Sequence, residues 1–150
     1  IHGGGQEAGL RSGTLSPALC AGFGAAAALA RARLQDDAAH VAQLWSLARK
    51  AMAGWTLNGS AEQRWRGNLN LRRDGLDVAR LMSDLRNVAF SAGSACASGS
   101  GRPSHVLRAI GLTDHQAKSS VRIGFGRYTT ARELEDACDR INAATAAQGV

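Results

Sequence analysis

The chain has 150 residues, of which 45% are hydrophobic and 20% are charged, and its formal net charge is +6 at pH 7. This length supports one domain with its own core, the composition is that of a soluble globular protein, and no run of about 18 apolar residues predicts a membrane span. The arginines are scattered and the few aromatic residues show no stacking pattern, so we expect no nucleic-acid binding.

Residues 1–14 are rich in glycine and predict an irregular loop. They lack the basic start and the apolar stretch of a signal peptide, and they contain no initiator methionine, so we interpret the chain as cut from a longer protein. Ser16 followed by Pro17 is typical of a helix start, and an alanine-rich helix is predicted over residues 17–33. A second helix is predicted over residues 36–52. Its buried stripe is expected to consist of Val41, Leu44, Trp45, Leu47 and Ala48.

Three short strands are predicted in the middle of the chain. The run 55–57 ends at Asn58-Gly59, which is a turn signal. Residues 68–71 alternate polar and apolar side chains, as a half-buried strand does, and residues 88–90 are the third candidate. A helix is predicted over residues 76–86. Its inward side chains are expected to be Leu76, Ala79, Leu81, Met82 and Leu85.

The last third of the chain predicts a short helix over residues 103–110, a strand over residues 119–125 and a helix over residues 130–147. Thr130 and Glu133 have the spacing of a capping box at the start of that last helix. Because strands and helices alternate irregularly, the sequence predicts an α+β fold with a small sheet covered by helices.

The three cysteines, Cys20, Cys96 and Cys138, are far apart and odd in number, which argues against a disulfide framework and for a reducing compartment. The chain has no Cys-x-x-Cys pair and its histidines lack ligand spacing, so we expect no metal site. Cys20 and Cys138 fall inside predicted helices among apolar residues, and both are expected in the core.

Cys96 has different surroundings, because residues 91–101 contain only serine, alanine, glycine and this one cysteine. Such a segment offers no large side chains for packing and little resistance to motion. A thiol on such an arm is reactive, which suggests a nucleophile or carrier that travels between two places. The alternative is a flexible linker that contains a cysteine by chance.

Arg122 lies in the predicted strand over residues 119–125, where positions 121, 123 and 125 are apolar and Ser120, Gly124 and Gly126 share the even face with it. The missing glycine side chains leave space in front of the guanidinium group, which suits a bidentate bond to a carboxylate. The alternative is a surface strand with a solvated arginine.

Residues 11–14, Arg-Ser-Gly-Thr, present hydroxyl and backbone N–H groups just before a helix. That position favours binding of a phosphate group. The alternative is an ordinary loop that leads into the helix.

Several stretches follow the order and spacing of a known family over nearly the whole chain. They are Gly3-Gly4-Gly5-Gln6-Glu7 with Leu10-Arg11-Ser12-Gly13-Thr14, Leu57-Asn58-Gly59, Asn68-Leu69-Asn70, Gly93-Ser94-Ala95-Cys96, Pro103 through Leu112, and Ser119-Ser120-Val121-Arg122 through Gly126-Arg127-Tyr128-Thr129-Thr130. With these motifs the chain resembles the cysteine desulfurases of the NifS/IscS type, which are members of the aminotransferase class V group.

The resemblance implies pyridoxal 5'-phosphate as the cofactor and L-cysteine as the substrate. In this family the thiolate that corresponds to Cys96 attacks the substrate sulfur, alanine leaves, and the resulting persulfide passes to an iron–sulfur scaffold or another sulfur-acceptor protein. Arg122 corresponds to the arginine that binds the substrate carboxylate. Thr14 corresponds to the threonine that reaches the cofactor phosphate of the partner subunit, which implies a homodimer.

The fold implied by the resemblance is the small C-terminal domain of a fold-type I PLP-dependent transferase, in which helices cover a small antiparallel sheet and a connecting helix precedes it. Residues 1–14 would continue from a large cofactor-binding domain that this sequence does not contain, and residues 15–150 would form the small domain with its linking helix. The cofactor-anchoring lysine of the family lies upstream, and neither Lys50 nor Lys118 falls in a matching motif. We therefore expect the isolated chain to be inactive. Ala8 departs from the pattern, since many members carry arginine there.

Two other functions remain open. A selenocysteine lyase-like class V enzyme would share the fold, and a non-enzymatic sulfur carrier or adaptor would use Cys96 without a cofactor. In each case we expect a cytoplasmic protein that does not bind a membrane.

Overall fold

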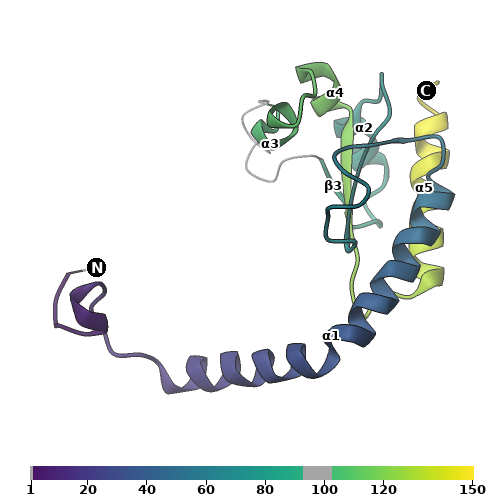
Figure 1. Ribbon diagram of the computed structural model, residues 1–150. Helices are drawn as coiled ribbons and strands as arrows, with labels where there is room; N and C mark the ends of the chain where they lie inside the picture. Colours follow the sequence, from purple (N-terminus) through teal and green to yellow (C-terminus); the bar gives the residue numbers. More distant parts are fainter. Residues whose placement is uncertain (1, 93–102) are drawn as a thin grey trace. The chain divides into compact units, whose positions relative to one another are not determined.

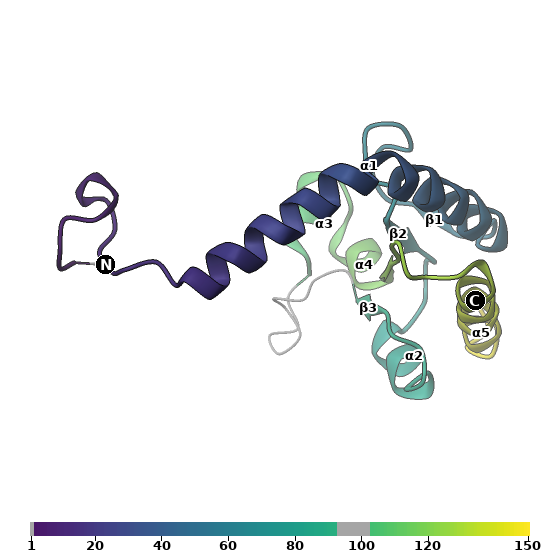
Figure 2. The ribbon, with the colours of Figure 1, turned by 90° about the horizontal axis from the view of Figure 1, so that it is seen from below.

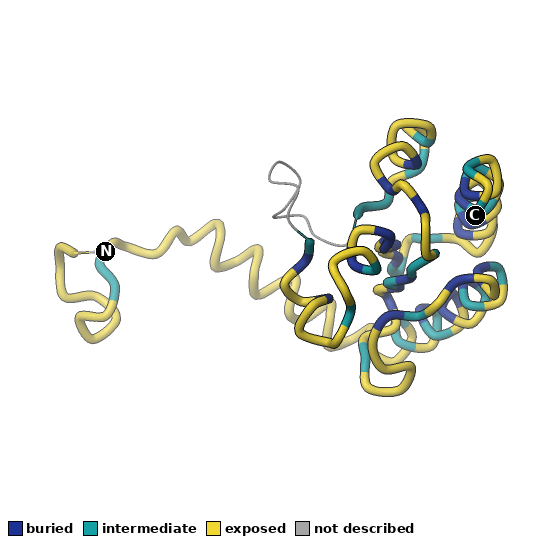
Figure 3. Tube along the Cα trace, turned by 90° about the horizontal axis from the view of Figure 1, so that it is seen from above, coloured by how far each residue is buried: buried dark blue, intermediate teal, exposed yellow. Residues whose placement is uncertain are grey.

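The computed structural model describes residues 2–92 and 103–150 and divides the chain into two units, Ile1–Asp36 and Asp37–Val150. The first unit holds a short 3-10 helix, η1 (Glu7–Gly9), and the first part of the long helix α1 (Pro17–Ala51) (Figure 1). Its described residues are exposed, apart from the half-buried Arg11 and Ser12 (Figure 3). The buried hydrophobic side chains of the described residues all belong to the second unit.

Helix α1 is one continuous helix, so the prediction of two helices, 17–33 and 36–52, was wrong. The junction Leu34-Gln35 contains neither glycine nor proline, so no residue there removes a backbone hydrogen bond or favours a break. The expected start is confirmed, because the Ser16 hydroxyl accepts a hydrogen bond from the Leu19 amide at 3.5 Å. The buried stripe is confirmed as well, with Leu47 half-buried.

Four strands form one antiparallel sheet in the order β1-β2-β4-β3. They are β1 (Thr56–Leu57), β2 (Asn68–Arg72), β3 (Ser91–Ala92) and β4 (Ser120–Gly124). The first, second and last of these confirm the predicted strands. The strand expected at residues 88–90 was wrong in position, because the residues that pair with β4 are Ser91 and Ala92.

The four other helices of the described chain are α2 (Val78–Asp84), α3 (His105–Ala109), α4 (Asp114–Lys118) and α5 (Ala131–Ala146). The prediction of α5 is confirmed together with its capping box, in which Thr130 and Glu133 satisfy each other's backbone amides. Helix α4 was not predicted from the sequence. It has only five residues, and its own capping box pairs Thr113 with Gln116.

The core lies between one face of the sheet and three helices (Figure 2): α5, α2 and the C-terminal part of α1. Leu69 and Leu71 of β2 and Val121 and Ile123 of β4 are at most 4% exposed. The helices contribute mainly Val41, Leu44, Ala48, Leu81, Leu134, Cys138 and Ile141. Ala79 and Met82 were expected in this core, but both are exposed because α2 is short and turns Val78 and Leu81 inward instead. The sheet order and the three helices that cover one face of the sheet confirm the predicted α+β fold with a small antiparallel sheet.

Candidate active site

Arg122 lies on the sheet face opposite the core, as the strand alternation predicted. Its neighbours Val121 and Ile123 are buried, whereas Arg122 and Gly124 are exposed. A Cβ atom placed on Gly124 would meet no heavy atom of the described chain within 4 Å, so the space next to Arg122 on β4 is open. Ser120 shares this face but is fully buried, so the even positions of β4 are not uniformly open.

Within residues 2–92 and 103–150, one hydrogen bond orients the Arg122 guanidinium group. Its Nε atom donates to the hydroxyl of Ser91 at 3.2 Å, and the two residues are directly opposed on β4 and β3. None of the ion pairs among the described residues involves Arg122. With Nε engaged, the two Nη groups remain as donors for a carboxylate, which is the geometry that a bidentate bond requires.

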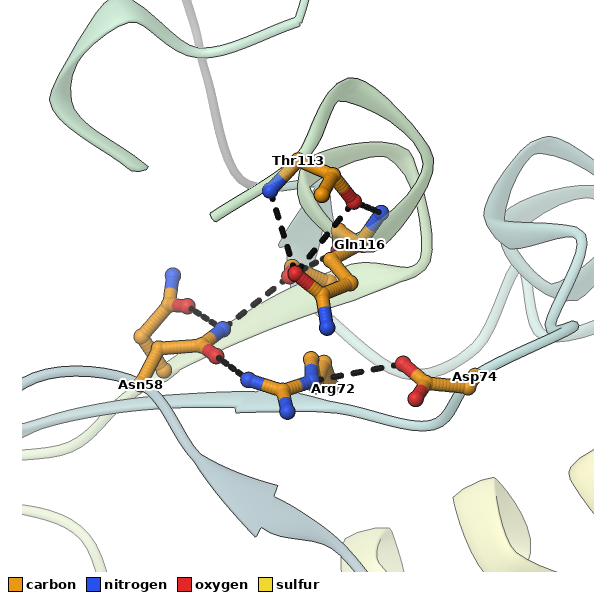
Figure 4. Close-up of polar contacts among 7 residues, drawn as sticks. Asn58, Arg72, Asp74, Thr113 and Gln116 are labelled. Atoms are coloured by element: carbon orange, nitrogen blue, oxygen red, sulfur yellow. Dashed lines mark hydrogen bonds and ion pairs between the residues drawn. The ribbon is translucent and has the colours of Figure 1, made fainter. Parts of the chain in front are cut away.

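Buried polar side chains continue along the same face toward β1 (Figure 4). The Nδ2 group of Asn58 donates to Oδ1 of Asn70 at 2.7 Å and to the Ser120 hydroxyl at 3.0 Å, and the Ser120 hydroxyl donates to the backbone carbonyl of Gln116 at 2.7 Å. Asn58 is only 4% exposed, so these hydrogen bonds take the place of those that its amide would make with water. They also fasten α4 to the sheet, because Gln116 belongs to that helix.

Arg72 completes this set of contacts at the end of β2. Its Nη1 group donates to Oδ1 of Asn58 at 3.5 Å, and its Nε group pairs with Asp74 at 3.3 Å (Figure 4). The pair with Asp74 is largely exposed on the aspartate side and contributes little stability by itself. Its structural effect is to hold the guanidinium group against the buried amide of Asn58.

Sequence reasoning missed Asn58, Asn70 and Ser91 as site residues. Asn58 was interpreted as a turn residue and Asn70 as the polar half of an alternating strand, and both assignments are correct locally. The missing information was the pairing of β2 and β3 with β4, which joins positions far apart in the sequence.

Thr14 lies in the first unit, and its side chain is exposed. The loop around it is closed by the Ser12 hydroxyl, which donates to the Gly4 carbonyl at 2.8 Å, and by an unusual backbone at Glu7 and Ala8, both with a φ of 55°. No hydrogen bond within the described residues uses the Thr14 hydroxyl, so it remains available to a ligand. Thr14 belongs to the first unit and Arg122 to the second.

Cys96 lies outside the described residues. The two other cysteines differ from each other. Cys138 is buried as predicted, and burial, with Asp139 and Glu135 nearby, raises the pKa of its thiol to about 11. The prediction for Cys20 was wrong, because this residue is exposed on the N-terminal part of α1.

Residues 2–92 and 103–150 contain neither a metal site nor a membrane-spanning helix. This part of the chain holds no group of three or more His, Cys, Asp or Glu side chains that could bind a metal ion. None of its helices is long and apolar enough to cross a membrane. The two lysines, Lys50 and Lys118, are exposed on α1 and α4.

Comparison with known proteins agrees with this architecture. The aminotransferase class-V family model matches residues 3–136. A cysteine desulfurase IscS of Shewanella woodyi is 44% identical over 146 residues, which cover 95% of this chain and 36% of that protein. A mitochondrial cysteine desulfurase of Saccharomyces cerevisiae is 44% identical over 138 residues, which cover 90% of this chain and 28% of that protein. The chain thus spans about a third of the length of these relatives.

Solved structures show the same similarity. A NifS-like protein of Rickettsia africae has a TM-score of 0.82 and 28% identity over 96% of this chain and 39% of its own. A structure of SspA in complex with cysteine has a TM-score of 0.58 and 33% identity over 87% of this chain and 36% of its own. The match to the family model, together with these structural similarities, shows that the chain belongs to the aminotransferase class-V family.

Proposed function

We propose that this chain is the C-terminal part of a cysteine desulfurase that takes sulfur from L-cysteine as a persulfide on Cys96 and releases L-alanine. The observation that carries the proposal is the exposed Arg122 on a polar sheet face, oriented by Ser91 from the strand that leads into the Cys96 segment. Cys96 follows Ala92, the last residue of β3, by four positions.

Arg122 would bind the substrate carboxylate through its two Nη groups. A carboxylate bound by two parallel N–H groups cannot rotate freely, so this contact sets the direction in which the substrate sulfur points. The thiolate of Cys96 would then attack that sulfur. The new S–S bond forms as the carbon–sulfur bond breaks, the electron pair of that bond stays with carbon, a proton is added there, and alanine leaves.

The carbon–sulfur bond of cysteine breaks only if its electron pair is accepted, and pyridoxal 5'-phosphate supplies that electron-accepting capacity when it is bound. The described residues fit this cofactor in part. The free hydroxyl of Thr14 suits its phosphate group, in the subunit arrangement of a homodimer. Lys50 and Lys118 are exposed on α1 and α4 and fall in no motif of the family, so the covalent anchor would come from another part of the protein.

The persulfide would be passed to an acceptor such as an iron–sulfur scaffold protein, in the cytoplasm. The reactive sulfur requires a reducing compartment, in which Cys20 and Cys138 stay as free thiols. A selenocysteine lyase would bind its substrate by the same carboxylate contact, so a comparison of alanine release from L-cysteine and from L-selenocysteine distinguishes the two enzymes.

The test is the kinetics of alanine release from L-cysteine by the full-length holoenzyme with Arg122→Lys. Lysine keeps the charge but loses the bidentate geometry. We expect KM for L-cysteine to rise about tenfold or more, since a hydrogen bond to a charged group contributes about 1.5–3 kcal/mol. Arg132→Lys, an exposed substitution on α5, is the matched control and should leave KM unchanged. An unchanged KM in the Arg122 variant would contradict the proposed carboxylate contact.

A further inference from the structure

Four polar side chains form a row across the sheet on the face that carries Arg122. Asn58 directly follows β1, and its backbone amide donates to the carbonyl of Asn70 on β2 at 3.0 Å. Asn70 is directly opposed to Arg122 on β4, which is directly opposed to Ser91 on β3. We call Asn58, Asn70, Arg122 and Ser91 the transverse row. Its members lie side by side although they are spread over 65 positions of the sequence, from 58 to 122.

The orientation of both amides in the transverse row follows from Arg72. A guanidinium group only donates hydrogen bonds, so the atom of Asn58 that faces Arg72 is its oxygen. The nitrogen of Asn58 is therefore the atom that faces Asn70 and Ser120. Asn70 must then offer its oxygen to Asn58, and its Nδ2 group forms the other end of the same planar amide.

The Nδ2 group of Asn70 makes no hydrogen bond within residues 2–92 and 103–150, although Asn70 is half-buried. Directly opposed residues of an antiparallel pair have Cβ atoms about 4.5–5.5 Å apart, so this amide is next to Arg122. Arg122 donates through Nε to Ser91 on β3, the strand on the other side of β4 from Asn70, so this bond does not engage the Asn70 amide. Two donor groups thus lie next to each other, and no acceptor of the transverse row is directed between them.

We propose that Asn70 is a second donor to the carboxylate of the amino-acid substrate, acting beside Arg122. This inference rests on the proposed function, because it assigns the group that Arg122 binds. A carboxylate has two oxygens that accept several hydrogen bonds, so it can take the Nη groups of Arg122 and the Nδ2 group of Asn70 together. Asn58 and Ser91 are positioning residues, since each fixes the direction of one of these donors.

The test compares two ligands of the full-length holoenzyme by titration calorimetry. L-Alanine, the amino acid released in the proposed reaction, carries the carboxylate, whereas L-alaninamide is uncharged at that position. In Asn70→Ala we expect the affinity for L-alanine to fall about fivefold to tenfold and the affinity for L-alaninamide to stay within about twofold. Asn70→Ser should show the same pattern, and its hydroxyl can still accept the bond from Asn58.

Asn68→Ala is the matched control, because Asn68 lies on the same face of β2 but opposite Gly124, one row away from Arg122. It should leave unchanged the ratio of the affinity for L-alanine to the affinity for L-alaninamide. A purely structural effect of Asn70 would weaken both ligands equally and would overturn the inference. If Arg122→Lys lowers the ratio while neither Asn70 variant does, the inference fails and the proposed function stands. If Arg122→Lys also leaves the ratio unchanged, the carboxylate contact itself is absent and both fail.

Discussion

The exposure of Arg122 can be predicted from the sequence, whereas its orientation depends on the fold. Its exposure follows from alternation along β4, which the sequence displays as apolar residues at every second position. Its orientation does not, because the hydroxyl that accepts the hydrogen bond from its Nε group belongs to Ser91, 31 positions earlier. The same holds for Asn58 and Asn70, whose roles depend on strand pairing. Residue types and faces could be predicted here, whereas contacts between distant strands could not.

Cys20 and Cys138 give a prediction for single residues, which can be tested in the isolated chain that carries Cys96→Ser. Cys20 is exposed and should react rapidly with a thiol reagent at pH 8. Cys138 is buried with a pKa raised to about 11, so almost none of it is thiolate at that pH, and it should react only after unfolding. The check is the number of thiols titrated with and without denaturant. Rapid reaction of both thiols in the folded chain would contradict the burial of Cys138.

Among the secondary-structure elements, those with strong local signals were predicted correctly. Helix α5 has an apolar stripe and a capping box, and β2 and β4 alternate clearly. Helix α4 was missed because five residues are too few for a periodic pattern to emerge. Strand β3 was misplaced because its two residues, Ser91 and Ala92, have low β-propensity and form a strand only by pairing with β4.

The capping box of α5 supplies a prediction at the element scale. Thr130→Ala removes the hydroxyl that caps the Glu133 amide, and loss of such a cap costs about 1 kcal/mol of the free energy of unfolding. The measurement is urea denaturation at neutral pH. Ser83→Ala on the exposed side of α2 is the control, and an equal effect of both substitutions would show that the cap contributes nothing specific.

The pH dependence of this effect has a definite sign. Hydrogen bonds from the backbone and side chain of Thr130 lower the pKa of Glu133. A lowered pKa in the folded state stabilises the fold above the unfolded pKa, and that contribution disappears as the pH falls through the folded value. The destabilisation caused by Thr130→Ala should therefore become smaller in acid. A difference that stays constant or grows toward low pH would contradict the assigned hydrogen bonds.

For the whole molecule, the core indicates which part of the chain folds together. The buried hydrophobic residues of the described chain begin at Val41, and the half-buried pair Asp37–Arg127 ties the start of the second unit to the turn after β4. Removal of residues 1–36 should therefore lower Tm by no more than about 4–8 °C, which corresponds to about 1 kcal/mol. Thermal denaturation of residues 37–150 beside the complete chain is the check. Loss of cooperative unfolding would show that the first unit contributes to the core.

The most direct test of the account is mass spectrometry of the full-length holoenzyme after addition of L-cysteine, with Cys96→Ser beside it. The proposed reaction predicts that the peptide with Cys96 gains one sulfur atom, that alanine is released, and that both products are lost in the variant. Alanine release without a persulfide on Cys96, or release that persists in Cys96→Ser, would contradict the role of Cys96 as the sulfur acceptor. No alanine release from an enzyme that binds its cofactor would contradict the desulfurase function itself.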